Sequence, residues 1–129
     1  MKFPFDPSHG LIVVRTRITG PAGDATAQLV LDTGAAKTML PPGLLASVGI
    51  DVASAREFAS IVTASHTITL PIVRVISLEA LGRVSKGLEV VCGELPRTAR
   101  VEGVLGLDVL GSGSLFIDFA RHTISLNDS

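Results

Sequence analysis

The sequence predicts an all-β domain with one or two short helices, and two observations support this. Most apolar segments are short, rich in β-branched residues and partly alternating with polar residues, as strands are. Clusters of Gly, Pro, Asp and Ser separate these segments, which is typical of tight turns. No fixed-period repeat, low-complexity tract or linker divides the 129 residues, so we expect a single domain over 1–129.

The first half of the chain is expected to form two hairpins separated by a short helix. The first hairpin joins strands 11–18 and 27–31, which places Asp32 directly after its second strand. A helix of one or two turns is expected within 41–49, because Pro at the start and Gly at the end are typical helix boundaries. A longer hairpin follows over 56–78.

The second half of the chain repeats this mixture of strands, turns and one short helix. We expect a strand at 88–92 after a turn at 85–87, then the apolar segment 104–106, a helix near 107–110, a loop at 111–114, and a closing hairpin with arms 115–119 and 123–126. The N-terminal residues 1–6 contain Pro4 and are a poor strand.

Composition narrows the possible functions. The formal net charge is −1 and no two Lys or Arg residues are adjacent, so a basic groove for nucleic acid is not expected. The longest segment without Asp, Glu, Lys or Arg, 58–73, is shorter than the roughly 20 apolar residues of a membrane-spanning helix. The start of the chain lacks the apolar core of a signal peptide, so we expect a cytoplasmic location. Because only 18% of residues are charged, we expect a partner to cover part of the apolar surface.

The most informative segment is Leu29–Ala35, an apolar strand that runs into Asp-Thr-Gly. Such a strand presents the Asp32 carboxylate at its end, and Gly34 allows the backbone to turn tightly and to approach another group closely. Taken alone, the tripeptide is most often only a turn. The residues around it therefore decide its meaning.

Three segments resemble the retropepsin-like (retroviral-type) aspartic proteases found in retroviruses and bacterial genomes. Val30–Ala35 with the trailing Thr38–Leu40 resembles the active-site segment of that family. Gly103–Leu110 resembles its apolar-apolar-Gly motif, which leads into a C-terminal helix. The residues 116–126 are similar to the closing hairpin of bacterial members. The resemblance thus extends over most of the chain, from Leu11 to Leu126.

The resemblance implies a closed β-barrel-like acid protease fold with one lobe per chain and an active site between two subunits. Each subunit of a homodimer is then expected to donate one Asp32 to an aspartic endopeptidase acting on a peptide or protein substrate. Two carboxylates about 3 Å apart cannot both ionise, so they share one proton. The ionised partner activates a water as general base, and the protonated partner polarises the scissile carbonyl. No cofactor or metal ion is implied.

The resemblance also assigns roles to the neighbours of Asp32. Thr33 is expected to hydrogen-bond across the dimer and Gly34 to let the two loops meet. Further residues are expected to contact substrate or to pack behind the site: Ala35, Ala36 and Lys37 after the tripeptide; Thr63, Ala64, Ser65 and His66 at the tip of a hairpin that falls where the family carries its flap; and Val104, Leu105 and Gly106 behind the Asp loop. The sequence departs from the family because this hairpin contains no Gly, and because Ala36 and Lys37 replace acidic residues of viral members.

Several alternatives stay open. The chain could be a catalytically silent dimerisation or peptide-binding module of the same fold, or a β-domain unrelated to proteases. His66 is either a group above the dyad or an exposed turn residue, and Cys92 is better explained as a core residue than as a nucleophile. Asp108 and Asp118 each have a structural interpretation, beside a helix and at a strand end. One Asp-Thr-Gly in 129 residues is half the number a two-lobed aspartic protease needs, which favours the homodimer.

Overall fold

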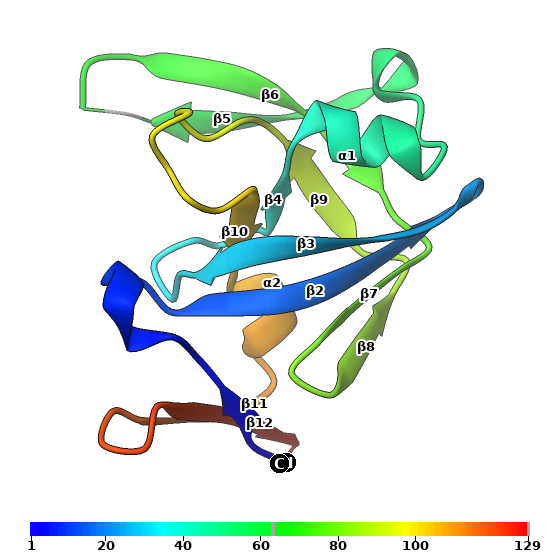
Figure 1. The fold of residues 1–129 in the computed structure, drawn as a ribbon. Coiled ribbons are helices and arrows are strands. Elements are labelled where there is room, and N and C mark those ends of the chain that lie inside the picture. Colours follow the sequence, from blue (N-terminus) through cyan, green and yellow to red (C-terminus); the bar gives the residue numbers. More distant parts are fainter. Residues whose placement is uncertain (63, 129) are drawn as a thin grey trace.

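The computed structural model describes residues 1–62 and 64–128. These residues form a nine-stranded sheet and a three-stranded sheet, accompanied by two short α-helices and two single-turn 3₁₀ helices (Figure 1). The expected mostly β fold with one or two short helices is therefore confirmed. No helix among the described residues is long and apolar enough to cross a membrane.

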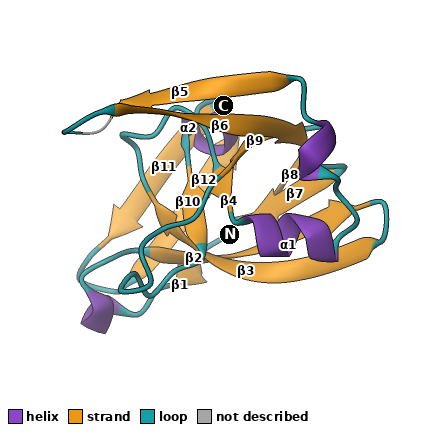
Figure 2. Ribbon diagram, turned by 90° about the horizontal axis from the view of Figure 1, so that it is seen from above, coloured by secondary structure: helices purple, strands orange, loops and turns teal. Residues whose placement is uncertain are grey.

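The larger sheet has the strand order β5-β6-β9-β4-β10-β3-β2-β7-β8 and curls around the core (Figures 1 and 2). Its strands are β2 (Val13–Gly20), β3 (Gly23–Leu31), β4 (Met39–Leu40), β5 (Glu57–Val62), β6 (Thr67–Arg74), β7 (Ser77–Ala80), β8 (Arg83–Lys86), β9 (Glu89–Cys92) and β10 (Gly103–Leu105). The long hairpins β2–β3 and β5–β6 lie on either side of the short strands β4, β9 and β10 (Figure 2). Full closure into a barrel is not confirmed, because β5 and β8 stand at the two ends of the strand order.

The smaller sheet contains both ends of the described chain, in the order β1-β12-β11. Its strands are β1 (Phe3–Pro4), β11 (Gly113–Asp118) and β12 (Thr123–Asp128). The expectation of a poor N-terminal strand is corrected, because Phe3 and Pro4 pair with Ile124 and Thr123. Pro4 is accommodated because β1 is an edge strand, where a missing N–H costs no ladder bond on the outer side.

The helices are short and lie beside the larger sheet. They are η1 (Pro7–His9), α1 (Pro42–Ser47), η2 (Val52–Ser54) and α2 (Leu107–Leu110). Of the four, α1 and α2 contribute to the core, through Leu45 and through Val109 and Leu110. This core is aliphatic, with Ile18, Leu29, Leu45 and Leu105 fully buried. In β2 the side chains alternate between exposed Arg15 or Arg17 and buried neighbours, as expected for a strand with one face on the core.

Two sequence expectations about turns are only partly confirmed. The turn expected at 85–87 is confirmed only at Gly87, which has a positive φ of 61°, because Ser85 and Lys86 belong to β8 and pair with Leu78 and Ser77 of β7. A further turn, which the sequence did not predict, lies at Leu81–Gly82 between β7 and β8, where the two residues have positive φ values of 53° and 76°. Two-residue hairpin turns of this kind usually contain Asn-Gly or Asp-Gly, because both residues need a positive φ. Leu rarely adopts this conformation, so Leu-Gly is not recognised as a hairpin turn from the sequence. The expected loop 111–114 is also shorter than predicted, because β11 begins at Gly113.

Candidate active site

The Asp32 loop joins β3 to β4, and the short strand β10 lies between these two strands and pairs with both. This strand pairs in parallel with β3, setting Leu105 opposite Leu31, and in antiparallel fashion with β4, setting Val104 opposite Met39. The chain therefore leaves β3, turns through 32–38 and returns on the other side of β10. The backbone N–H of Asp32 continues the ladder by donating to the Leu105 carbonyl over 3.0 Å. The position of the Asp32 carboxylate thus follows from the sheet itself.

Within the loop, the Asp32 carboxylate accepts a local hydrogen bond. The Gly34 N–H donates to Asp32 Oδ1 over 2.8 Å, and the Ala35 N–H donates to the Asp32 carbonyl over 3.2 Å. A Cβ on Gly34 would lie 3.1 Å from Asp32 Oδ1, so a side chain there would crowd the carboxylate. Asp32 is exposed. The loop thus presents one carboxylate to solvent in a hydrogen-bonded orientation.

A partly buried hydrogen-bond clamp fixes the far end of the loop to α2. Thr38 is fully buried and donates twice to the Asp108 carboxylate, from N–H over 2.9 Å and from the hydroxyl over 2.7 Å. The Thr38 hydroxyl oxygen accepts the Gly106 N–H over 3.1 Å, so Asp108, Thr38 and Gly106 form one network. The structural interpretation of Asp108 is therefore specific: its carboxylate accepts the two hydrogen bonds that hold Thr38 beside α2.

Close backbone packing beneath the loop explains the glycine of the apolar-apolar-Gly segment. A Cβ on Gly106 would lie 2.8 Å from the Lys37 carbonyl carbon and 2.9 Å from the Ala35 carbonyl oxygen. A real side chain does not approach backbone this closely, so any larger residue would push the loop away. The Leu107 N–H donates to the same Ala35 carbonyl over 2.8 Å. Gly106 therefore allows α2 to support the Asp32 loop directly.

An open groove of about 520 Å³ lies between this loop and strand β5. Its described lining is mostly apolar and consists of Asp32, Gly34, Ala35, Ala36, Lys37, Met39, Ala59, Ser60, Ile61, Val62, Val91 and Val104. Figure 1 places the β5–β6 hairpin at the end of the molecule opposite the β1–β12–β11 sheet, with β3 and β10 between them. The groove thus combines an apolar surface with a single exposed carboxylate.

The structure brings together part of the predicted set. Asp32, Gly34, Ala35, Ala36, Lys37 and Val104 line the groove. Leu105 and Gly106 are buried behind it, whereas Thr33 is exposed beside it. The hairpin-tip residues Ala64, Ser65 and His66 are exposed and are not part of the lining, with the Ser65 hydroxyl 2.8 Å from His66 Nδ1. Thr63 lies outside the described residues.

Sequence reasoning missed the apolar walls of the groove. Met39, Ile61 and Val91 come from three separate strands that only the pairing of the sheet brings to one place. It also missed the Thr38–Asp108 contact, which joins residues 70 positions apart. The available signal for that contact was an acid in the first turn of a helix that follows a motif glycine.

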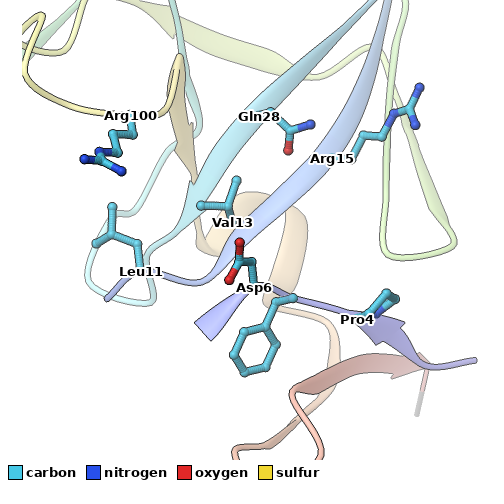
Figure 3. Close-up of a pocket in the computed structure, with 8 residues that line it drawn as sticks. Pro4, Asp6, Leu11, Val13, Arg15, Gln28 and Arg100 are labelled. Carbon is cyan, nitrogen blue, oxygen red and sulfur yellow. The ribbon is translucent and has the colours of Figure 1, made fainter. Parts of the chain in front are cut away.

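A smaller hollow of about 330 Å³ lies between the N-terminal segment 4–6 and the start of β2, and Asp32 is not among its lining residues. Figure 3 shows Leu11 and Val13 within it, with Arg15 and Arg100 on opposite sides of the view. None of the predicted site residues lines this hollow. Among the described residues, no group of three or more His, Cys, Asp or Glu side chains is placed to hold a metal ion.

Comparisons with known proteins agree with the motifs and with the fold. Residues 18–112 match the family model described as "gag-polyprotein putative aspartyl protease". The fold is similar to the crystal structure of a retropepsin-like aspartic protease from Rickettsia conorii, with a TM-score of 0.72 and 16% identity, over 99% of this chain and 89% of that one. A search of the curated proteins finds no match. Because the family model covers most of the chain and includes the Asp32 loop, the chain belongs to this family of retropepsin-like aspartic proteases.

Proposed function

We propose that the chain is an aspartic endopeptidase that hydrolyses peptide bonds with Asp32. The observation that carries this proposal is the exposed Asp32 carboxylate in an open apolar groove, on a loop secured by the Thr38–Asp108 clamp. Such a groove suits an extended peptide, because the peptide side chains can pack against the apolar walls while its backbone lies beside the Asp32 carboxylate. Membership of the aspartic protease family supports the same chemistry.

The second carboxylate is proposed to come from a second copy of the chain. Asp32 is the only acid in the groove lining among the described residues, and the Asp108 carboxylate is engaged by Thr38. Asp-Thr-Gly occurs once in the sequence. A two-fold symmetric pair of chains brings the same loop from each copy to one axis and supplies two equivalent Asp32 side chains.

In such a pair, one proton is shared between the two carboxylates. The ionised Asp32 accepts a proton from the attacking water, and the protonated Asp32 donates a hydrogen bond to the scissile carbonyl. The proton gained from water then passes to the departing amine, so the protonation of the pair is restored when both products leave. Exposed Thr33 is available for a hydrogen bond across the axis, and Gly34 permits close approach of the two loops.

The β5–β6 hairpin is proposed to close over bound peptide. Its strand β5 already forms one wall of the groove, and its apolar side chains Phe58 and Val62 are 55% and 79% exposed in the isolated chain. Closing the hairpin over substrate would cover part of this surface and exclude water from the reacting bond.

Peptide cleavage by the wild type and by Asp32→Asn tests the proposal. A fluorogenic peptide library is incubated with each protein at pH values from about 3 to 7, the range in which carboxylate pairs work. We expect cleavage by the wild type and loss of at least about a thousandfold in kcat/KM for the variant. Binding of peptides without turnover at every pH would instead identify a catalytically silent peptide-binding module. Matching circular dichroism spectra of the two proteins exclude misfolding as the cause of any loss.

A further inference from the structure

Lys37 is the one cation in the described lining of the groove. The other eleven lining residues include a single charged side chain, that of Asp32, and the walls are built from aliphatic residues such as Met39, Ile61 and Val91. Lys37 is exposed, and among the described residues its ammonium group makes no ion pair or hydrogen bond. A positive charge is thus available to a molecule that lies in the groove.

We propose that Lys37 makes the groove selective for peptides with an acidic side chain near, but not at, the cleaved bond. This inference rests on the proposed peptide-binding groove and specifies its substrate class. Lys37 follows Asp32 by five positions in the same lining, and among the described residues no ion pair joins the two side chains, so a bound peptide can meet the ammonium group separately from the Asp32 carboxylate. Residues at the cleaved bond contact apolar walls beside Asp32, and a Glu or Asp side chain further along reaches the ammonium group.

The physical reason lies in the surroundings of the charge. An ammonium on an ordinary surface is well hydrated, and an ion pair with it is weak. A peptide lying against the aliphatic walls removes water from one side of Lys37, which strengthens its attraction for a carboxylate. The same desolvation penalises a Lys or Arg of the peptide at that position, because like charges repel. Selectivity therefore arises from attraction of acidic peptides and rejection of basic ones.

Two-fold symmetry gives this selectivity a recognisable pattern. In the proposed pair of chains, each copy contributes one Lys37, and the two lie on opposite sides of the shared axis. A bound peptide then meets one cation before the cleaved bond and another after it. We expect acidic side chains to be favoured at one position on each side of an apolar central pair.

The test uses fluorogenic peptides with a central Leu-Phe pair, in which each flanking position is set in turn to Glu, Gln or Lys. For the wild type we expect Glu to be preferred over Gln by about threefold to tenfold in kcat/KM at one position on each side. Lys37→Gln should abolish the preference, Lys37→Glu should reverse it towards Lys, and Lys37→Arg should retain it. Lys86→Glu, an exposed substitution on β8 outside the groove lining with the same change in charge, is the matched control and should leave it unchanged.

A second readout separates this inference from the proposed catalysis. The same peptides are titrated against the Asp32→Asn protein, with and without Lys37→Glu, and binding is followed by fluorescence anisotropy. We expect tighter binding of Glu-containing peptides, reversed by Lys37→Glu and weakened at high salt because charges in the open groove are screened. Equal affinity for Glu, Gln and Lys peptides overturns the role of Lys37, even if cleavage occurs. Charge-selective binding without any cleavage by the wild type supports Lys37 and contradicts the protease proposal alone.

Discussion

Removing the Asp108 carboxylate is expected to destabilise the domain, because this exposed group accepts two hydrogen bonds from the buried Thr38. In Asp108→Ala, the Thr38 N–H and hydroxyl both lose their acceptor, and Thr38 is fully buried. Hydrogen bonds to charged groups contribute about 1.5–3 kcal/mol each, and water that enters beside the exposed Asp108 recovers part of this. We therefore expect the free energy of unfolding to fall by about 2–4 kcal/mol, a large share of the 5–15 kcal/mol typical of a small domain.

Urea denaturation of matched variants measures this loss. Asp108→Asn keeps one acceptor oxygen and should lose roughly half as much free energy as Asp108→Ala. Thr38→Val should lose about 1–3 kcal/mol, because the Gly106 N–H then lacks its acceptor, whereas Thr38→Ser should lose much less. In a double-mutant cycle, Thr38→Val and Asp108→Ala should be coupled by about 1 kcal/mol or more. Asp24→Ala, which breaks an exposed ion pair with Arg17, is the control and should change stability by less than about 0.5 kcal/mol.

One result would contradict the proposed role of the Thr38–Asp108 clamp. If Asp108→Ala changes the free energy of unfolding no more than Asp24→Ala, and the cycle shows no coupling, the Thr38–Asp108 contact does not hold the loop in solution. If the domain loses stability as expected, kcat/KM should also fall by about tenfold to a hundredfold, because a misplaced Asp32 loop costs rate.

Three further predictions follow from the loop and the core. Gly106→Ala should lower stability by about 1–3 kcal/mol, since its Cβ would meet the Lys37 and Ala35 backbone; Gly43→Ala, where nothing lies within 4 Å, is the control, and equal urea midpoints for the two would contradict this. The Arg121 N–H and guanidinium donate to Asp118 and lower the pKa of its carboxyl below 3.8. The ionised Asp118 therefore stabilises the fold above pH 3.8, and this contribution to the free energy of unfolding is lost as the pH falls through the folded-state pKa. Asp118→Asn should therefore melt at a lower temperature than the wild type at pH 6, with the difference closing in acid; a pH-independent difference would oppose this. Burial, and secondarily Glu94, raise the pKa of the Cys92 thiol, so iodoacetamide should alkylate the native protein at least about tenfold more slowly than the urea-unfolded one, and equal rates would show the thiol accessible.

The sequence was sufficient where the signal is local. The alternation in β2, the helix boundaries around Pro42 and the Asp-Thr-Gly after β3 all depend on neighbouring residues, and the corresponding elements are confirmed. The hairpin β7–β8 was missed because Leu81 takes a positive φ that no propensity predicts. The short strand β1 was missed because its pairing with β12 joins residues about 120 positions apart.

In the candidate site, too, the sequence predicted the residues that are close together in the chain and missed those that only the fold brings together. The residues on the loop itself, from Asp32 to Lys37, were identified because they are consecutive. The walls of the groove, including Met39 and Val91, depend on the strand order and have no signature of their own. The predicted contacts of Ser65 and His66 with substrate stay a prediction, because they concern a closed hairpin over bound peptide.

The central claim, that two chains each supply one Asp32, is tested most directly by mixing wild-type protein with Asp32→Asn. A fixed amount of wild type is co-refolded with an equal amount of the variant, and total peptidase activity is measured. Adding an equal amount of variant doubles the number of pairs, and random pairing makes about one quarter of them fully wild type. If both carboxylates of a pair are required, total activity should therefore fall to about half. The decrease should continue as more variant is added. Total activity that stays unchanged at every ratio would contradict the shared dyad.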